Sequence, residues 1–154
     1  MVILKKDIEI QIRPMTIQDY DEVFAMWQIT TKRALSDADS RENIGFYLGR
    51  NPGMSQVAVV NGKIVGTVLC GHDGRRGFIH HMAVLPDYRR HQIGMKLAAK
   101  GLDAIAASGI AKTHIFCYTN NELGQSFWKA MGWTKRDDVY VFSSSSGQNG
   151  SSTL

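Results

Sequence analysis

A short basic segment, PDYRRHQIGMKL (residues 86–97), has the residue types of a phosphate-binding site. Two arginines and a histidine at 89–91 come directly before apolar residues at helical spacing, which predict a helix from Ile93. The first N–H groups of a helix lack partners within it and together act as about half a positive charge. We therefore expect a phosphate or pyrophosphate there, which Gly94 would allow to approach the backbone closely. A solvated basic turn that only caps the helix is the alternative.

The first half of the chain predicts two helices followed by a meander of strands. Alternating apolar residues over 8–14 predict a strand, and helices are expected from Thr16 and over about 40–48. The pair Asn61-Gly62 between two apolar runs predicts a hairpin, and the turn HDGRRG leads to a further strand, FIHHMAVL. These strands should pair in antiparallel fashion.

The second half predicts a central helix over 93–108, a strand over 113–119, a helix over 121–131 and two final strands, GWTKR and VYVFS. The order of elements is therefore β-α-α-β-β-β-α-β-α-β-β. This order describes an α+β protein with a mixed, mostly antiparallel seven-stranded sheet flanked by four helices.

The composition is that of an ordinary globular protein. With 154 residues, 44% of them hydrophobic and 21% charged, the chain can bury a core without disulfides or metals. We expect one domain over residues 1–142 and a flexible serine- and glycine-rich tail over 143–154. We see no signal peptide or membrane-spanning run, and neither cysteine lies in a C-x-x-C pair. We therefore expect a cytoplasmic protein without membrane association.

The net charge of +4 and the pI near 9.2 are compatible with nucleic acid, an acidic membrane or a phosphate-bearing small molecule as partner. Nucleic acid is disfavoured, because the basic residues form no stripe and no stacking aromatic residues interleave them. The five histidines have no metal-ligand spacing, so we expect no metal site.

Two motifs resemble those of the GCN5-related N-acetyltransferases (GNAT family). In that family a strand ending V-x-P-x-[YF]-R leads into an [RQ]-x-x-G-x-[GA] loop that binds the pyrophosphate of coenzyme A, and residues 84–94, VLPDYRRHQIG, have this layout. Residues 121–133, NELGQSFWKAMGW, are similar to the family's N-x-x-A-x-x-[LF]-Y-x-x-x-G-[FY]. The resemblance covers about residues 8 to 142, and HDGRRG resembles a bacterial subgroup with little assigned function.

The resemblance implies a GNAT-like fold and transfer of the acetyl group of acetyl-CoA to a primary amine of a small molecule or protein. The amine would attack directly in a ternary complex. Backbone groups of Met82 and Val84 would pair with the pantetheine arm, and Asn121 would contact the coenzyme nearby. The coenzyme-binding residues expected from the resemblance are Met82, Ala83, Val84, Arg89, Arg90, His91, Gln92, Ile93, Gly94, Met95, Asn121 and Trp128. For Asn121 a plain helix N-cap is the alternative, and both roles can hold together.

Three positions depart from the family pattern. Gln92 stands where the loop usually has its first glycine, which narrows the space beside the phosphates but adds a hydrogen-bond donor. Trp128 replaces a tyrosine thought to protonate the leaving thiolate, and Phe116 stands where some members carry a glutamate base. An amine with a pKa of about 10 must lose a proton to attack, whereas a thiol with a pKa of about 8.5 leaves readily, so a base is needed more than an acid.

His80 is the candidate base, because histidine titrates near neutrality and the family places this strand beside the acetyl group. Related enzymes with a histidine base resemble this chain in placing it four residues before the strand's final valine. Strict alternation would turn His81 to the opposite face. A cross-strand hydrogen-bonding role is the alternative for His80. Tyr118 is a candidate proton donor, with simple aromatic packing as its alternative, and the oxyanion is expected to meet a backbone N–H of the strand.

The acceptor would lie against the first two helices and the loop between them. The candidate contacts are Trp27, Asp37, Phe46 and Tyr47, with Leu35 and Asp39 nearby, since acidic residues beside aromatic rings suit a cationic amine. Core packing is the alternative for aromatic residues at helical spacing. The acceptor's identity is left open, as is a monomer or homodimer. A non-catalytic acyl-CoA sensor is the alternative function, motivated by the replaced tyrosine and glutamate.

Overall fold

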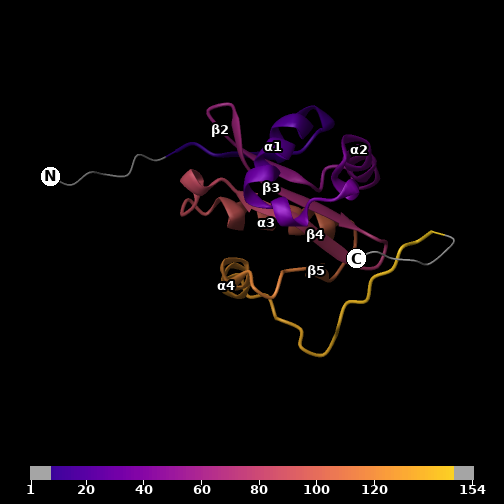
Figure 1. Cartoon of the computed structure of the whole chain (residues 1–154). Helices are drawn as coiled ribbons and strands as arrows, with labels where there is room; N and C mark the ends of the chain where they lie inside the picture. The colour runs from indigo at the N-terminus through magenta and orange to yellow at the C-terminus, as the bar shows by residue number, and fades with distance from the viewer. Residues whose placement is uncertain (1–7, 148–154) are drawn as a thin grey trace. The chain divides into compact units, whose positions relative to one another are not determined.

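The computed structural model describes residues 8–147, and its elements follow the predicted order through the fourth helix (Figure 1). The described residues form two compact units, one running to Phe116 and one starting at Cys117. The helices are α1 (Tyr20–Thr30), α2 (Arg41–Arg50), α3 (Ile93–Ala107) and α4 (Glu122–Ala130). None of the helices in this part of the chain is both long enough and apolar enough to cross a bilayer.

Five strands form one mixed sheet in the first unit. They are β1 (Gln11–Pro14), β2 (Gln56–Val60), β3 (Lys63–His72), β4 (Gly77–Val84) and β5 (Thr113–Ile115). Their order in the sheet is the order in the chain, with β5 parallel to β4 and the other neighbours antiparallel. Asn61 and Gly62, with φ of +49° and +77°, form the turn between β2 and β3, which confirms the predicted hairpin.

The described residues contain five strands, whereas the sequence predicted seven. The segments GWTKR and VYVFS form no regular strand, and the apolar side chains of residues 139–142 are between 56% and 93% exposed. β5 is also shorter than the predicted strand over 113–119. An alternating pattern becomes a strand only where a neighbouring strand accepts its hydrogen bonds and one face is buried. The alternation in VYVFS indicates a propensity to form a strand, but it does not provide a neighbouring strand to pair with.

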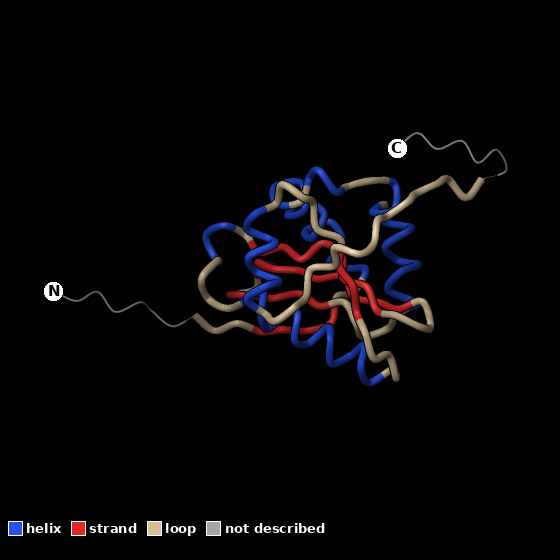
Figure 2. The backbone as a smooth tube through the Cα atoms, turned by 90° about the horizontal axis from the view of Figure 1, so that it is seen from below, coloured by secondary structure: helices blue, strands red, loops and turns tan. Residues whose placement is uncertain are grey.

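Helices cover both faces of this sheet (Figure 2). Trp27 of α1 and Ile44 of α2 belong to one core cluster with Val57 and Leu69 of the sheet. On the other face α3 lies directly on Gly66 of β3. A Cβ at that position would lie 3.0 Å from the side chains of both Ile93 and Leu97, so the glycine allows this close approach without a shift of either side chain.

Candidate active site around strand β4

Strand β4 does not keep a strict alternation, because it carries a β-bulge. Its residues His81 and Met82 together lie opposite the single residue Val68 of β3. His81 has φ +47°, in the left-handed region that few residues other than glycine adopt. The bulge turns the His81 side chain toward α1, on the side where His80 contacts α2. The expectation that the two histidines face opposite sides is therefore wrong.

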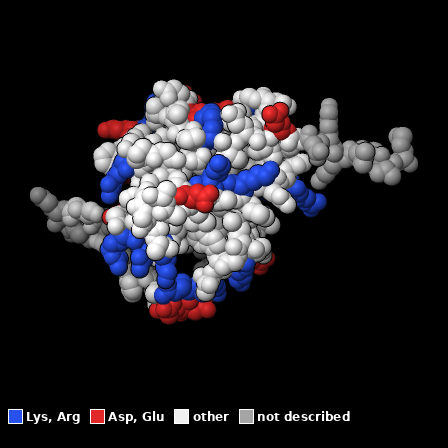
Figure 3. All heavy atoms as spheres, turned by 180° about the vertical axis from the view of Figure 1, so that it is seen from behind, with Lys and Arg blue, Asp and Glu red and all other residues white. Residues whose placement is uncertain are grey.

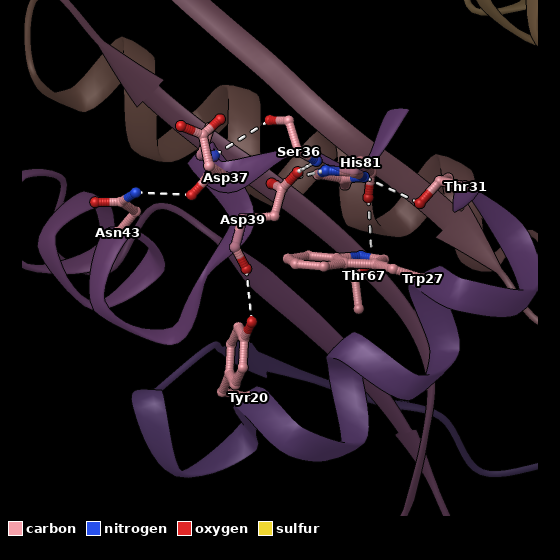
Figure 4. Close-up of polar contacts among 10 residues, drawn as sticks. Tyr20, Trp27, Thr31, Ser36, Asp37, Asp39, Asn43, Thr67 and His81 are labelled. Atoms are coloured by element: carbon pink, nitrogen blue, oxygen red, sulfur yellow. Dashed lines mark hydrogen bonds and ion pairs between the residues drawn. The ribbon is translucent and has the colours of Figure 1, made fainter. Parts of the chain in front are cut away.

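The His81 side chain is held by contacts on every side (Figure 4). Its ring stacks on Trp27, with 4.3 Å between ring centroids and 21° between planes. Its Nε2 lies 2.9 Å from Oδ1 of Asp39 and its Nδ1 lies 3.0 Å from Oγ1 of Thr31. The hydroxyl of Thr67 donates to the His81 carbonyl at 3.1 Å, and the side chains of His81 and Asp39 are 5% and 8% exposed.

Asp39 is a buried carboxylate with several hydrogen-bond donors. Burial raises its pKa, but the hydrogen bond from His81, the charge of His81 and the backbone N–H of Ser36 together bring the pKa below its ordinary value. The hydroxyl of Tyr20 donates to the Asp39 carbonyl at 2.6 Å. Asp39 is thus ionised and occupied within the fold, so its carboxylate is not presented to an incoming cation.

His80 has a different environment from its neighbour. Its ring meets the edge of Tyr47 at 6.2 Å and lies parallel to Phe78 at 6.5 Å, measured between ring centroids. Among residues 8–147 the His80 imidazole makes no hydrogen bond with a protein group. Burial lowers the pKa of His80, and the charge of His81 adds to this effect while that of Asp39 opposes it. The imidazole is therefore held neutral near pH 7, as a general base requires.

The turn before α3 contains left-handed backbone. Arg90 and Gln92 have φ of +70° and +61°, and Gln92 is the N-cap of α3 without a capping hydrogen bond from its side chain. Arg89 and Arg90 are exposed and His91 is half-buried. The Nε of Arg89 donates to the Val84 carbonyl at 3.2 Å, which ties the turn to the end of β4.

The first turn of α3 has one anchored side and one open side. Ile93 is buried against Gly66, whereas Met95 is 48% exposed and Gly94 between them presents only backbone. This first turn carries no acidic residue. Uncapped N–H groups beside two exposed guanidinium groups fit an anion such as a pyrophosphate.

The other residues expected at the coenzyme are placed as follows in β4. Ala83 is only 6% exposed and belongs to the core cluster under α1 and α2, so it can meet a ligand only through its backbone. Met82 and Val84 are half-buried. Met82 is part of the bulge and has no one-to-one partner on β3, whereas Val84 pairs with Gly66.

Three expected residues lie in the second unit. Asn121 is the N-cap of α4, and its Oδ1 accepts from the Gly124 N–H at 2.9 Å, which confirms the capping role. Trp128 packs against Trp133, with 4.6 Å between ring centroids. Tyr118 is 43% exposed, and its carbonyl accepts from the Asn121 N–H at 3.0 Å.

The four residues expected at the acceptor divide into buried and exposed groups. Trp27 is fully buried and its Nε1 donates to Thr67 at 3.0 Å, so core packing describes it. The Tyr47 hydroxyl is buried without a hydrogen-bond partner among residues 8–147, in the space that a Cβ on Gly71 would enter. Burial raises its pKa.

Phe46 is 74% exposed on α2, and Asp37 is exposed at the start of the turn Asp37–Asp39. These two residues keep side chains available on the surface. On the face drawn in Figure 3, Lys and Arg occur in separate groups with Asp and Glu among them, and no continuous basic stripe crosses it.

Sequence reasoning missed the residues that hold the bulge. Thr31 was not predicted as a site residue. His81 and Asp39 were not expected to meet, because they are 42 residues apart in the sequence, but in the structure their side chains share a hydrogen bond. The signal available was the doublet His80-His81 inside an apolar strand, since a buried imidazole such as that of His81 needs polar partners from another element.

Comparisons with known proteins agree with this arrangement. A 132-residue match to an acetyltransferase of Sodalis glossinidius (strain morsitans) is 28% identical and covers 85% of this chain and 92% of that protein. The solved structure of PaiA N-acetyltransferase from Thermoplasma acidophilum in complex with coenzyme A has a TM-score of 0.73 at 18% identity, covering 84% of this chain and 92% of that one.

A second solved structure, AAC(6')-Iy in complex with the bisubstrate analog CoA-S-monomethyl-acetylneamine, has a TM-score of 0.72 at 16% identity, covering 88% of this chain and 97% of that one. At such low sequence identity, the structural similarity establishes the fold alone. The model of the Acetyltransferase (GNAT) family matches residues 17–133, which span both motifs. This chain therefore belongs to the GNAT family of acetyltransferases.

Proposed function

We propose that this protein is an acetyl-CoA-dependent N-acetyltransferase that acts on a primary amine of a small molecule or a protein. The observation that carries the proposal is that one compact unit combines the uncapped start of α3, suited to a pyrophosphate, with a neutral, buried imidazole on β4. Only residues 85–88, which include a short 3-10 helix, separate the end of β4 from the turn of residues 89–92, so both groups belong to one continuous segment. Membership of an acetyltransferase family supports the same reaction.

The coenzyme would be bound mainly through backbone groups. The first N–H groups of α3, with Arg89, Arg90 and His91 around them, would hold the pyrophosphate. Gln92, Ile93, Gly94 and Met95 form that first turn, and Met82, Ala83 and Val84 would contact the pantetheine arm through the backbone beside the bulge. Asn121 and Trp128 of the second unit are proposed to contact the coenzyme as well. A backbone N–H of β4 would meet the developing oxyanion.

His80 would supply the base. It would take a proton from the bound ammonium, directly or through one water, so that the free amine can attack the thioester carbonyl and form the C–N bond. The nitrogen then loses its second proton to water, and the C–S bond breaks to release the thiolate of coenzyme A. The lowered pKa of His80 keeps its lone pair available near neutrality. Tyr118 is the proposed donor of a proton to the thiolate, although a thiolate is stable enough to leave with little help.

The acceptor would approach along the surface formed by α2 and the turn before it. The exposed Phe46 and Asp37 are the proposed contacts, and the ring of Tyr47 would act from beside His80. Trp27 is buried, so it would support this surface from the core without contacting the acceptor. An acid near an exposed aromatic ring suits a cationic amine. Amino sugars belong in a first panel of acceptors, because AAC(6')-Iy has been solved with an acetylneamine analog.

We further propose a finer arrangement for the whole chain. One domain would span residues 1–142, with 143–154 as a tail; residues 148–154 of that tail lie outside the described residues. The protein would act in the cytoplasm as a monomer or homodimer, with no metal, nucleic acid or membrane as partner. Among the described residues no group of acidic, histidine or cysteine side chains is arranged to hold a metal ion.

The test is to incubate the protein with acetyl-CoA and a panel of amino sugars, polyamines and lysine-containing peptides while following thiol release. The variant His80→Gln should lower kcat by about 10² to 10⁴, the usual contribution of general base catalysis. His72→Gln, at the last residue of β3, is the matched control and should keep full activity. Binding of coenzyme A without thiol release on any amine would instead identify a non-catalytic sensor.

A further inference from the structure

The proposed chemistry makes no use of His81, although this residue is more completely held than any residue assigned a role above. Both of its ring nitrogens have partners, its ring face lies on Trp27, and its carbonyl accepts from Thr67 (Figure 4). The partners Thr31 and Asp39 come from the segment that follows α1, far from β4 in sequence. We refer to Thr31, Asp39 and His81 as the clamp.

The clamp holds a backbone conformation that is otherwise unfavourable. His81 has φ +47° at the bulge, and a left-handed residue other than glycine persists only where its surroundings hold it in place. The surroundings here are side chains: one carboxylate, one hydroxyl and one indole ring. Their bonds reach the imidazole from two sides and leave it a single orientation.

The bulge decides which way the residues on either side of it face. Before the bulge, Phe78 and His80 lie on the side of α2, and Ile79 between them is buried on the opposite side. After the bulge, Ala83 lies in the core cluster under α1 and α2. In a regular strand of the same residues, without the bulge, Ile79 and Ala83 would face the same side, because residues four apart in an alternating strand share a face.

We propose that Thr31, Asp39 and His81 are positioning residues for acetyl transfer, which fix the β4 bulge and thereby the direction of the His80 imidazole and of the Met82 backbone. This inference rests on the proposed site at β4. His81 itself is no candidate base, because both ring nitrogens are occupied and its side chain is 5% exposed. The clamp acts through its neighbours in the strand.

The sharpest test removes one hydroxyl group and leaves the side-chain volume nearly unchanged. Thr31→Val deletes the partner of Nδ1, and Thr31→Ser restores it. Thr30→Val is the matched control, because the Thr30 hydroxyl bonds only to the Met26 carbonyl of its own helix, at 2.8 Å. We expect the single-turnover rate of Thr31→Val to fall by about 3- to 10-fold, the value of one hydrogen bond, with the KM for acetyl-CoA unchanged. Thr31→Ser and Thr30→Val should stay within about 2-fold of the parent protein.

Equal rates in Thr31→Val and Thr30→Val would overturn the proposal, and so would a Thr31→Val loss that Thr31→Ser does not rescue. Amide hydrogen exchange provides a second readout that needs no turnover. Residues 80–84 should exchange faster in Thr31→Val than in Thr30→Val if the clamp fixes the bulge, and equal exchange would also overturn it. If the parent protein transfers acetyl to no amine, the proposed function fails, while this exchange comparison still decides whether the clamp exists.

Discussion

Besides Asn61 in the hairpin turn, two places among residues 8–147 hold residues other than glycine in the left-handed region, and these two are stabilised in opposite ways. At the β4 bulge, His81 is clamped by buried side chains from a distant segment. In the turn before α3, Arg90 and Gln92 have similar φ values but are exposed, and no side chain caps the helix that follows. The difference separates geometry that the protein fixes by itself from geometry that it leaves for a ligand to complete.

This contrast matches the chemistry proposed at the two places. Acetyl transfer requires the base and the oxyanion donor to be in position before the substrate arrives, because preorganised groups need no rearrangement during reaction. A pyrophosphate needs only accessible N–H groups and positive charge. In this proposal the clamp serves the reacting centre, whereas the uncapped turn serves coenzyme binding.

Glycine substitutions at His81 and at Gln92 test the comparison, and the largest expected effect is that of His81→Gly. His81→Gly should lower the free energy of unfolding by about 3–5 kcal/mol, because it leaves the buried Asp39 carboxylate without its partner. Urea unfolding measures this loss. If His81→Gly left the free energy of unfolding unchanged, relief of the left-handed backbone would offset the loss of all clamp contacts. The contrast between the two places would then not hold.

A second helix start sharpens the comparison, because α4 has the side-chain cap that α3 lacks. Asn121→Ala should cost about 1 kcal/mol in the free energy of unfolding, the usual value of an N-cap. Asn121→Ser keeps a capping oxygen and should recover most of this loss. Urea titrations of the three proteins provide the measurement, and an unchanged midpoint in Asn121→Ala would show that α4 does not depend on its cap.

At the turn, Gln92→Gly should be neutral or stabilising by up to about 1 kcal/mol, since glycine adopts φ +61° without steric cost. It should also strengthen coenzyme A binding, because the side chain beside the phosphates is removed. Isothermal titration calorimetry measures that affinity. A loss of stability similar to that of His81→Gly would mean that the turn is clamped after all and that the two places do not differ.

The smallest expected effect is that of pH on His80. Because burial lowers its pKa in the folded protein, its NMR titration midpoint should lie below the 6.5 of free histidine. The folded state then binds fewer protons than the unfolded state, so His80 costs no stability above pH of about 6.5 and lowers it as pH falls through the folded pKa. His80→Gln should remove this part of the acid dependence. A midpoint above the free value would show that His80 is not buried as a neutral base.

The sequence was sufficient for the parts of the fold set by local pattern. Asn61-Gly62 predicts its hairpin because that turn needs positive φ at both residues, and the helical spacing from Ile93 predicts α3. The family resemblance drawn from 84–94 and 121–133 is confirmed by the family match over residues 17–133. Each of these signals lies within a few residues of the feature it predicts.

The features that the sequence did not predict depend on contacts between distant segments. The bulge at His81 requires Asp39 and Thr31, which no local pattern connects to β4, and strict alternation therefore misplaced His81. Trp27 has the residue type of an acceptor contact, but its partner is the hydroxyl of Thr67 in the core. The alternation of VYVFS likewise predicted a strand without a partner.

Gly66 of β3 affects the start of the neighbouring helix α3. Ile93 is the first residue of α3 and rests directly on that position, so the depth at which the helix begins is set by the absence of a methyl group on β3. An alanine there would press on the side chains of Ile93 and Leu97, which would have to give by a few tenths of an ångström. In the proposed site, the position of the pyrophosphate would therefore depend on how closely α3 packs on β3 at Gly66.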